Sequence, residues 1–200
     1  MGIDHEEDMR RRRDLKNPMH LYAYLRSFDV PTTTWGRGSA KTFDHLHREI
    51  VAGEAFLVED GKILVREIRL VKVAVFYKAG DGKVLQLCEE KQVFKNGRVR
   101  IRGFKYIGEK MKPGEHSGLA ALRAIAEELG VVEGITLLDH KTSSPSPEFS
   151  KSYPGLMTRI VEESFTVFMP HNLYKPEGYK EEQEDKTTYF VWQEVETPPQ

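Results

Sequence analysis

Two adjacent glutamates, Glu127 and Glu128, lie near the end of a short apolar stretch in this 200-residue chain. Glu115 comes before the stretch, and Arg123 lies within it. Carboxylate oxygens bind hard cations such as Mg²⁺ and also pair with arginine, and Arg123 and Glu127 are one helical turn apart. Acids in the last turn of a helix oppose the helix dipole, at a cost of roughly a few tenths of a kcal/mol. Two interpretations follow: a cation-binding cluster or a solvated helix end.

The spacing of these acids resembles the Nudix box, the pattern G-x5-E-x7-R-E-U-x-E-E-x-G-U, in which U is a bulky aliphatic residue. Glu115 is followed by seven residues and then by Arg123, as in the pattern. The later positions of the box fall on Ile125, Glu127, Glu128, Gly130 and Val131. The resemblance extends over residues 65–195 and implies a Nudix-like α/β/α sandwich with a mixed β-sheet.

The same resemblance implies an activity and a set of site residues. In the family, glutamates of the box helix hold a divalent metal, so Glu127 and Glu128 would be ligands of Mg²⁺ or Mn²⁺. Glu115 would orient or ligate the metal, and Arg123 would hold the glutamates by ion pairing. The metal would polarise phosphate oxygens and activate the attacking water during hydrolysis of a pyrophosphate bond.

Two positions of the chain depart from the box. Glu109 stands where the first glycine is expected, and Ala124 stands where the glutamate after the arginine is expected. Because positions 124, 127 and 128 share one helix face, this alanine removes one of three helical carboxylates. Glu109, or an acid of the later loop, could take its place, and Glu109 and Glu182 are the substitute ligands that we predict. The acids of that loop are Glu181, Glu182 and Glu184.

A basic segment precedes the box. Alternation along a strand would place Arg98, Arg100 and Arg102 on one side, where they could grip phosphate groups by bidentate hydrogen bonds. The other interpretation is an exposed polar strand face. If the arginines bind substrate, they favour a ligand with several phosphates, such as a dinucleotide, an inositol pyrophosphate or a capped RNA end; capped RNA is not favoured.

The composition excludes several classes of protein. A formal net charge of −1 gives no overall preference for nucleic acid or anionic lipid. One cysteine, Cys88, excludes an intramolecular disulfide, and no Cys/His spacing is typical of zinc. Since no apolar run is long enough to span a membrane and the first residues lack the pattern of a signal peptide, we expect a cytoplasmic location.

The elements that position these residues can be predicted from hydrophobic patterning. Residues 41–50 predict a short helix, and the β-branched run from Ile63 predicts two strands or one bent strand. The central helix is predicted over Ser117–Leu129, with Ser117 as N-cap, Gly130 after its last turn, and Leu122 among the buried side chains. Further strands are predicted at residues 84–94, 98–107, 135–140, 158–169 and 187–195.

These patterns predict one domain with an extension. Residues 1–62 form the N-terminal extension, and residues 63–200 form the Nudix-like domain. The basic run Arg10–Arg13 is interpreted as part of a solvated arm or as a contact for a polyanion. The predicted function is metal-dependent hydrolysis of a pyrophosphate bond in a nucleoside diphosphate derivative or other polyphosphorylated small molecule. The alternative is a catalytically inactive Nudix-fold module that binds a phosphorylated ligand or a protein partner; a homo-oligomer is left open.

Overall fold

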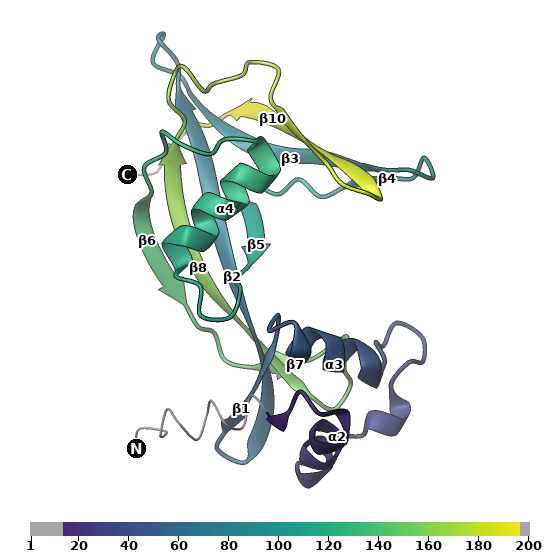
Figure 1. Ribbon diagram of the computed structural model, residues 1–200. Coiled ribbons are helices and arrows are strands. Elements are labelled where there is room, and N and C mark those ends of the chain that lie inside the picture. The colour runs from purple at the N-terminus through teal and green to yellow at the C-terminus, as the bar shows by residue number, and fades with distance from the viewer. Residues whose placement is uncertain (1–13, 197–200) are drawn as a thin grey trace. The chain divides into compact units, whose positions relative to one another are not determined.

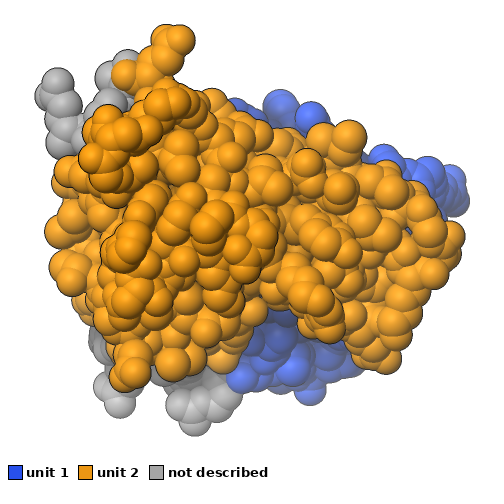
Figure 2. Space-filling view, turned by 90° about the horizontal axis from the view of Figure 1, so that it is seen from above, with its two compact units in different colours: residues 1–69, 143–161 blue, residues 70–142, 162–200 orange. Residues whose placement is uncertain are grey.

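The computed structural model of the chain describes residues 14–196, so the run Arg10–Arg13 lies outside the described residues. The chain forms two compact units, residues 1–69 with 143–161 and residues 70–142 with 162–200 (Figure 2). The boundary predicted between residues 62 and 63 falls inside the first unit. Within the described part, no helix is long and apolar enough to cross a membrane.

The first unit is built from short helices and a β-hairpin. Its elements are α2 (Pro18–Ser27), the 3-10 turn η1 (Thr32–Thr34), α3 (Phe43–Val51), β1 (Phe56–Asp60), the first part of β2 (Ile63–Lys78), β7 (Glu148–Phe149) and the start of β8 (Met157–Phe168). Asn17 begins α2, because its side chain accepts hydrogen bonds from the N–H groups of Met19 and His20. Trp35 packs against the buried ring of Tyr153 in the core of this unit.

The second unit contains the open mixed sheet and the central helix α4 (Ser117–Leu129) (Figure 1). The spatial order of the strands is β6 (Leu138–Ser143), β8, β2, β3 (Val84–Phe94), β10 (Lys186–Glu194) and β9 (Tyr179–Glu182). Strand β4 (Val99–Ile101) pairs with β3, and β5 (Ile107–Lys110) pairs with β2. The predicted α/β class with a mixed sheet is therefore confirmed.

Helix α4 and the sheet share one apolar core. On the helix, Ala120, Ala121, Ala124, Ile125 and Leu129 are buried. They belong to a cluster that also contains side chains of β2 and β8, namely Val71, Val73, Val75, Phe165 and Val167. Small alanines on the buried face allow the helix to approach the strands closely, which fixes the position of its C-terminal acids.

The ends of α4 are set by local chemistry. His116 is the N-cap, since its ring accepts a hydrogen bond from the N–H of Gly118, so the prediction of Ser117 as N-cap was wrong by one residue. Gly130 follows the last turn with φ of 69°, the left-handed conformation that glycine adopts without strain. The predicted helix bounds are confirmed. The predicted burial of Leu122 is wrong, because 39% of this side chain is exposed.

Candidate functional site

Arg123 joins the loop before α4 to the end of the helix. Its guanidinium donates to both carboxylate oxygens of Glu115, at 2.8 and 2.9 Å. It also donates to the carbonyl oxygen of Lys110 at 2.9 Å and to Glu127 at 3.1 Å. Glu115 further accepts a hydrogen bond from the N–H of Lys112 at 2.8 Å. We call this set of contacts the Arg123 lock, because it fixes the loop between β5 and α4.

The Arg123 lock keeps Glu115 ionised. Hydrogen bonds from Arg123 lower the pKa of Glu115 to about 2, and the N–H of Lys112 contributes further. The same pair raises the pKa of Arg123 above its ordinary value. Both oxygens of Glu115 are thus occupied by donors, so this residue acts in the structure as a support for the loop.

Glu128 lies in a different environment at the end of α4. Burial, together with the negative charges of Glu181, Glu109 and Glu89, raises the pKa of Glu128 to about 8, while the positive charge of Arg102 opposes this shift. These four carboxylates come from α4, β9, β5 and β3. We call them the Glu128 cluster. Carboxylates that are partly shielded from water repel one another, and a bound cation would reduce this repulsion.

The first predicted substitute ligand, Glu109, belongs to the Glu128 cluster. It lies on β5 in register with Val71 of β2 and accepts a hydrogen bond from the N–H of Lys110 at 2.8 Å. Glu109 stands where the Nudix box has a glycine, and its negative charge contributes to the raised pKa of Glu128.

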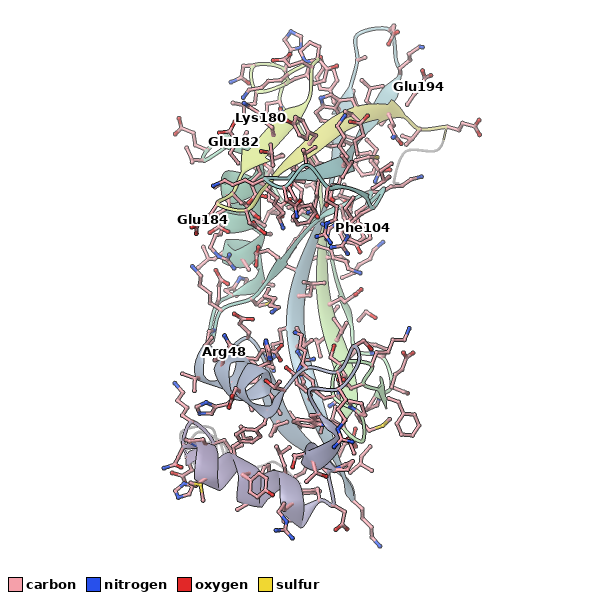
Figure 3. The ribbon with its side chains drawn as sticks, turned by 90° about the vertical axis from the view of Figure 1, so that its right-hand side faces the viewer. Arg48, Phe104, Lys180, Glu182, Glu184 and Glu194 are labelled. Atoms are coloured by element: carbon pink, nitrogen blue, oxygen red, sulfur yellow. The ribbon has the colours of Figure 1, made fainter. Side chains whose placement is uncertain are left out.

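Strand β9 brings the acidic loop to the site through Glu181. Tyr179 is buried and donates its hydroxyl to the carbonyl oxygen of Leu173 at 2.6 Å, which anchors the strand. Glu181 follows two residues later on the same face of the strand. Glu182 points to the other face, where it is exposed and pairs with Lys180 at 2.6 Å (Figure 3). The structure thus brings Glu181, and not Glu182, into the Glu128 cluster.

The third acid of the loop, Glu184, lies elsewhere. It is exposed and lines an open surface cavity of about 540 Å³. The other residues that line this cavity are Phe94, Lys95, Asn96 and Asp185. The cavity is therefore lined by residues at the end of β3, in the turn that follows it, and in the turn before β10.

The three predicted substrate-binding arginines do not form a row. The strand that carries them, β4, is only three residues long. The guanidinium of Arg98 lies over the ring of Phe94 at 4.1 Å, and Arg100 is exposed. Arg102 turns inward and makes two hydrogen bonds to the carboxylate of Glu89, one of them of 2.7 Å from Nε. Of these three arginines, Arg98 and Arg100 are exposed and Arg102 is half-buried.

Glu89 was missed from the sequence, and Glu181 was named only as one of three acids of the later loop, with Glu182 preferred. Glu89 lies in the middle of β3, is 3% exposed, and follows the buried residue Leu87 by two positions. A register shift between Tyr189 and Phe190 disturbs the pairing of β10 with this part of β3, and no sequence signal marks it. The alternation of Tyr179 and Glu181 is a signal that could have separated Glu181 from Glu182.

The donor chemistry of the Glu128 cluster fits a hard divalent cation, because all of its members are carboxylates. Within residues 14–196, however, no three acidic, histidine or cysteine side chains are close enough together to hold a metal ion. Carboxylates of Glu128, Glu181 and Glu109 would have to draw together around an ion. Ala124 cannot contribute, and its side chain is completely buried in the core.

No family model matches the sequence, and the search of curated proteins found no match. Among the solved structures that this chain resembles are two described as Nudix proteins. A protein from Listeria monocytogenes assigned as a Nudix hydrolase is 17% identical over 62% of this chain and 75% of its own, with a TM-score of 0.39. A MutT/nudix family protein from Enterococcus faecalis is 16% identical over 65% of this chain, with a TM-score of 0.40.

An Ap4A hydrolase from C. elegans is 16% identical over 62% of this chain and 77% of its own, with a TM-score of 0.29. This chain spans only 44% of the length of the Enterococcus protein. All three TM-scores are below 0.5.

Proposed function

We propose that this chain is a metal-dependent pyrophosphohydrolase that acts on a nucleoside diphosphate derivative or another polyphosphorylated small molecule. The observation that supports this proposal is the Glu128 cluster. The charges of three carboxylates from three strands act on Glu128 at the end of α4, where the helix dipole already disfavours negative charge. A bound cation would favour the ionised form of Glu128 in these surroundings, so the cluster supports a cation-dependent function.

Each residue of the site has a distinct part in this proposal. Glu128, Glu181 and Glu109 would hold the ion, which supplies Lewis acidity toward phosphate oxygens and a more acidic bound water. Glu127 would be held at the edge of the site by its contact with Arg123. Arg123 and Glu115 would keep the loop and the helix end in one geometry. A fixed arrangement of the reacting groups raises the rate of hydrolysis.

The exposed arginines suggest how the substrate is held. Arg98 and Arg100 extend from the β3–β4 hairpin with no carboxylate partner among the described residues, so each can bind a phosphate group. Arg102 is already paired with Glu89 and is less suited to that task. The proposal therefore places substrate phosphates on Arg98 and Arg100 rather than on all three arginines.

The test is hydrolysis of a substrate panel by the wild type and two glutamine variants. The panel contains nucleoside diphosphate derivatives, dinucleoside polyphosphates, inositol pyrophosphates and capped RNA, each with Mg²⁺ or Mn²⁺. Glu128→Gln should lower the rate at least roughly a hundredfold, the scale of losing a group that positions metal and water. Glu133→Gln, an exposed acid just beyond α4, should match the wild type. Equal rates in all three proteins would remove Glu128 from the site.

One observation favours a second function, a catalytically inactive module that binds a phosphorylated ligand or a protein partner. The third carboxylate of the box helix is absent, and Ala124 fills that position with a completely buried side chain. If this function is correct, no substrate of the panel is hydrolysed. Calorimetry without divalent metal should then still detect binding of a phosphorylated member of the panel, and Arg98→Gln together with Arg100→Gln should weaken it.

A further inference from the structure

The surface cavity of about 540 Å³ lies where two turns of the second unit meet. The turn after β3 and the start of β10 lie side by side (Figure 1), because Phe94 of β3 pairs with Lys186 of β10. The N–H of Lys95 also donates to the carbonyl oxygen of Asp185 at 2.9 Å, which ties one turn to the other. The volume is in the range of small-molecule sites, roughly 300–1,000 Å³. The cavity is thus a candidate ligand site with a fixed backbone.

Phe94 gives the cavity an aromatic surface. Its side chain is half-buried and lines the cavity. The guanidinium of Arg98 lies over the same ring, 4.1 Å from the ring centroid. Aromatic rings and guanidinium groups are the surfaces on which nucleobases stack. Arg98, to which the proposed function assigns a phosphate group of the substrate, therefore adjoins the cavity.

The polar side chains of the cavity are exposed and available to a ligand. Glu184 and Asp185 come from the turn before β10, and Lys95 and Asn96 come from the turn after β3. Among residues 14–196, Lys95, Glu184 and Asp185 make no ion pair, although they line one cavity. The side-chain oxygen of Asn96 accepts from the N–H of Arg98 at 3.1 Å, which leaves its amide N–H groups as donors. One turn therefore offers acceptors and the other offers donors.

This combination of acceptors and donors is complementary to guanine. The N1–H and the 2-amino group of guanine lie side by side and can donate to one carboxylate, while the neighbouring O6 accepts from Lys95 or Asn96. On the same edge, adenine has an acceptor nitrogen at N1, so a carboxylate would face a lone pair. The charges of Glu184 and Asp185 also repel phosphate groups, and Arg98 attracts them, so charge sets the direction in which a nucleotide lies.

The cavity lies close to the Glu128 cluster along the chain. Glu184 follows Glu181, a member of the cluster, by three residues, which can span at most about 10 Å. Gln183, between them, donates from its side chain to the carboxylate of Glu181 at 2.7 Å. A nucleoside diphosphate has a comparable length. A base in the cavity and a phosphate chain that extends toward Glu181 are therefore compatible.

We propose that this cavity binds the guanine base of the phosphorylated ligand, which makes a guanosine diphosphate derivative the substrate class. The base packs on Phe94, Glu184 or Asp185 accepts from its N1–H and 2-amino group, and the phosphates lie toward Arg98. The inference rests on the proposed function for the fate of the ligand. It concerns recognition of the base and not hydrolysis, so it can be tested without metal.

The experiment measures the binding of GDP, IDP and ADP to the full chain by calorimetry in EDTA. IDP is GDP without the 2-amino group, so the two nucleotides differ only in one donor of the base. We expect the wild type to bind GDP at least about tenfold more tightly than either IDP or ADP, the scale of one hydrogen bond to a charged group.

Variants test which side chains produce this preference. Glu184→Ala together with Asp185→Ala should weaken binding of GDP at least about tenfold. It should also bind GDP and IDP alike within about twofold, because the 2-amino group has lost its acceptor. Glu177→Ala is the matched control, an exposed acid of the loop before β9 that does not line the cavity, and it should keep the preference of the wild type. Phe94→Leu should weaken binding of all three nucleotides by similar factors, because each base loses the stacked ring.

The possible results separate this inference from the proposed function. A smaller preference of the wild type for GDP, or no binding of any of the three nucleotides, overturns the inference even if a substrate of the panel is hydrolysed. A double variant that keeps the preference overturns it as well. If the double variant does not fold, the comparison of nucleotides on the wild type decides. Selective binding of GDP by a protein that hydrolyses nothing supports the cavity as a guanine site and removes the enzymatic function.

Discussion

Ala124 fills a place where the Nudix pattern has an acid, and its surroundings decide what a glutamate there would do. The box pattern suggests that Ala124→Glu restores a metal ligand if no other acid replaces the missing one. In the structure, the side chain of Ala124 is completely buried in the apolar core between α4 and the sheet. A glutamate would overfill this space and bury a carboxylate, so we expect a loss of about 2–5 kcal/mol in the free energy of unfolding. We also expect no gain in affinity for Mn²⁺.

Denaturant unfolding and calorimetry check this prediction together. Leu119→Glu is the matched control, because Leu119 lies on the same helix with 63% of its side chain exposed, and it should change stability by less than about 0.5 kcal/mol. If Ala124→Glu is as stable as the wild type and binds Mn²⁺ more tightly, the helix face can open toward the Glu128 cluster and the expectation from the sequence was correct.

At the level of elements, the site depends on β9, which carries Glu181 to the cluster. Gly178 precedes this strand with φ of 83°, and a Cβ atom there would lie 2.0 Å from the carbonyl oxygen of Phe190 in β10. Gly178→Ala must therefore push β9 away from β10 or strain the backbone. We expect it to cost more than about 1 kcal/mol in unfolding free energy and to weaken binding of Mn²⁺, because Glu181 moves.

A second glycine, Gly97, separates the effect of the steric clash at Gly178 from the effect of a positive φ. Gly97 has φ of 80°, but a Cβ atom there would meet no atom within 4 Å. Gly97→Ala thus carries the strain of a positive φ alone, and it should destabilise the protein less than Gly178→Ala and leave metal affinity unchanged. Equal effects of the two variants on stability and on metal affinity would mean that the contact with Phe190 does not position β9.

The elements that could be predicted are those with signals in their own sequence. The bounds of α4 follow from its apolar spacing and from Gly130. Strand β9 was missed because Tyr179–Glu182 has no apolar run, and it exists only through its pairing with β10. Helix α2 was also missed, although Asn17 followed by Pro18 is a signal for a helix start that could have found it.

The site was predicted only where its residues are close together in the sequence. Glu115, Arg123 and Glu127 meet in the Arg123 lock, as the spacing of the box suggests, although their catalytic parts stay a prediction. Glu89 and Glu181 come from distant strands, and their approach to Glu128 depends on sheet register. Patterns within single segments do not contain that information.

For the molecule as a whole, an ion pair in the first unit tests whether a local loss of stability also affects the second unit. Glu49 of α3 is 8% exposed and accepts hydrogen bonds from Arg66 at 2.6 and 2.9 Å and from Lys41 at 2.8 Å. Burial alone would raise the pKa of Glu49, but the hydrogen bond from Lys41 and the charge of Arg66 lower it below 4.5. We expect Glu49→Gln to cost about 3–5 kcal/mol at pH 7, because it leaves Arg66 buried without a charged partner.

The pH dependence of this cost has a definite sign. Because the pKa of Glu49 is lower in the folded protein, its stabilisation is complete above about pH 4.5 and is lost as the pH falls through the folded value. The difference in stability between the wild type and Glu49→Gln should therefore shrink below pH 4.5. Glu148→Gln, an exposed acid of the same unit, should show no such dependence.

The two tryptophans of the chain report on the two units separately, since Trp35 lies in the first and Trp192 in the second. In variants that keep only one of them, fluorescence during denaturant unfolding follows one unit at a time. All hydrogen bonds of Glu49 lie within the first unit, so Glu49→Gln should move the midpoint seen by Trp35 more than the midpoint seen by Trp192. Equal shifts would show that the two units unfold as one cooperative structure, and the loss of the ion pair would then reduce the stability of the site as well.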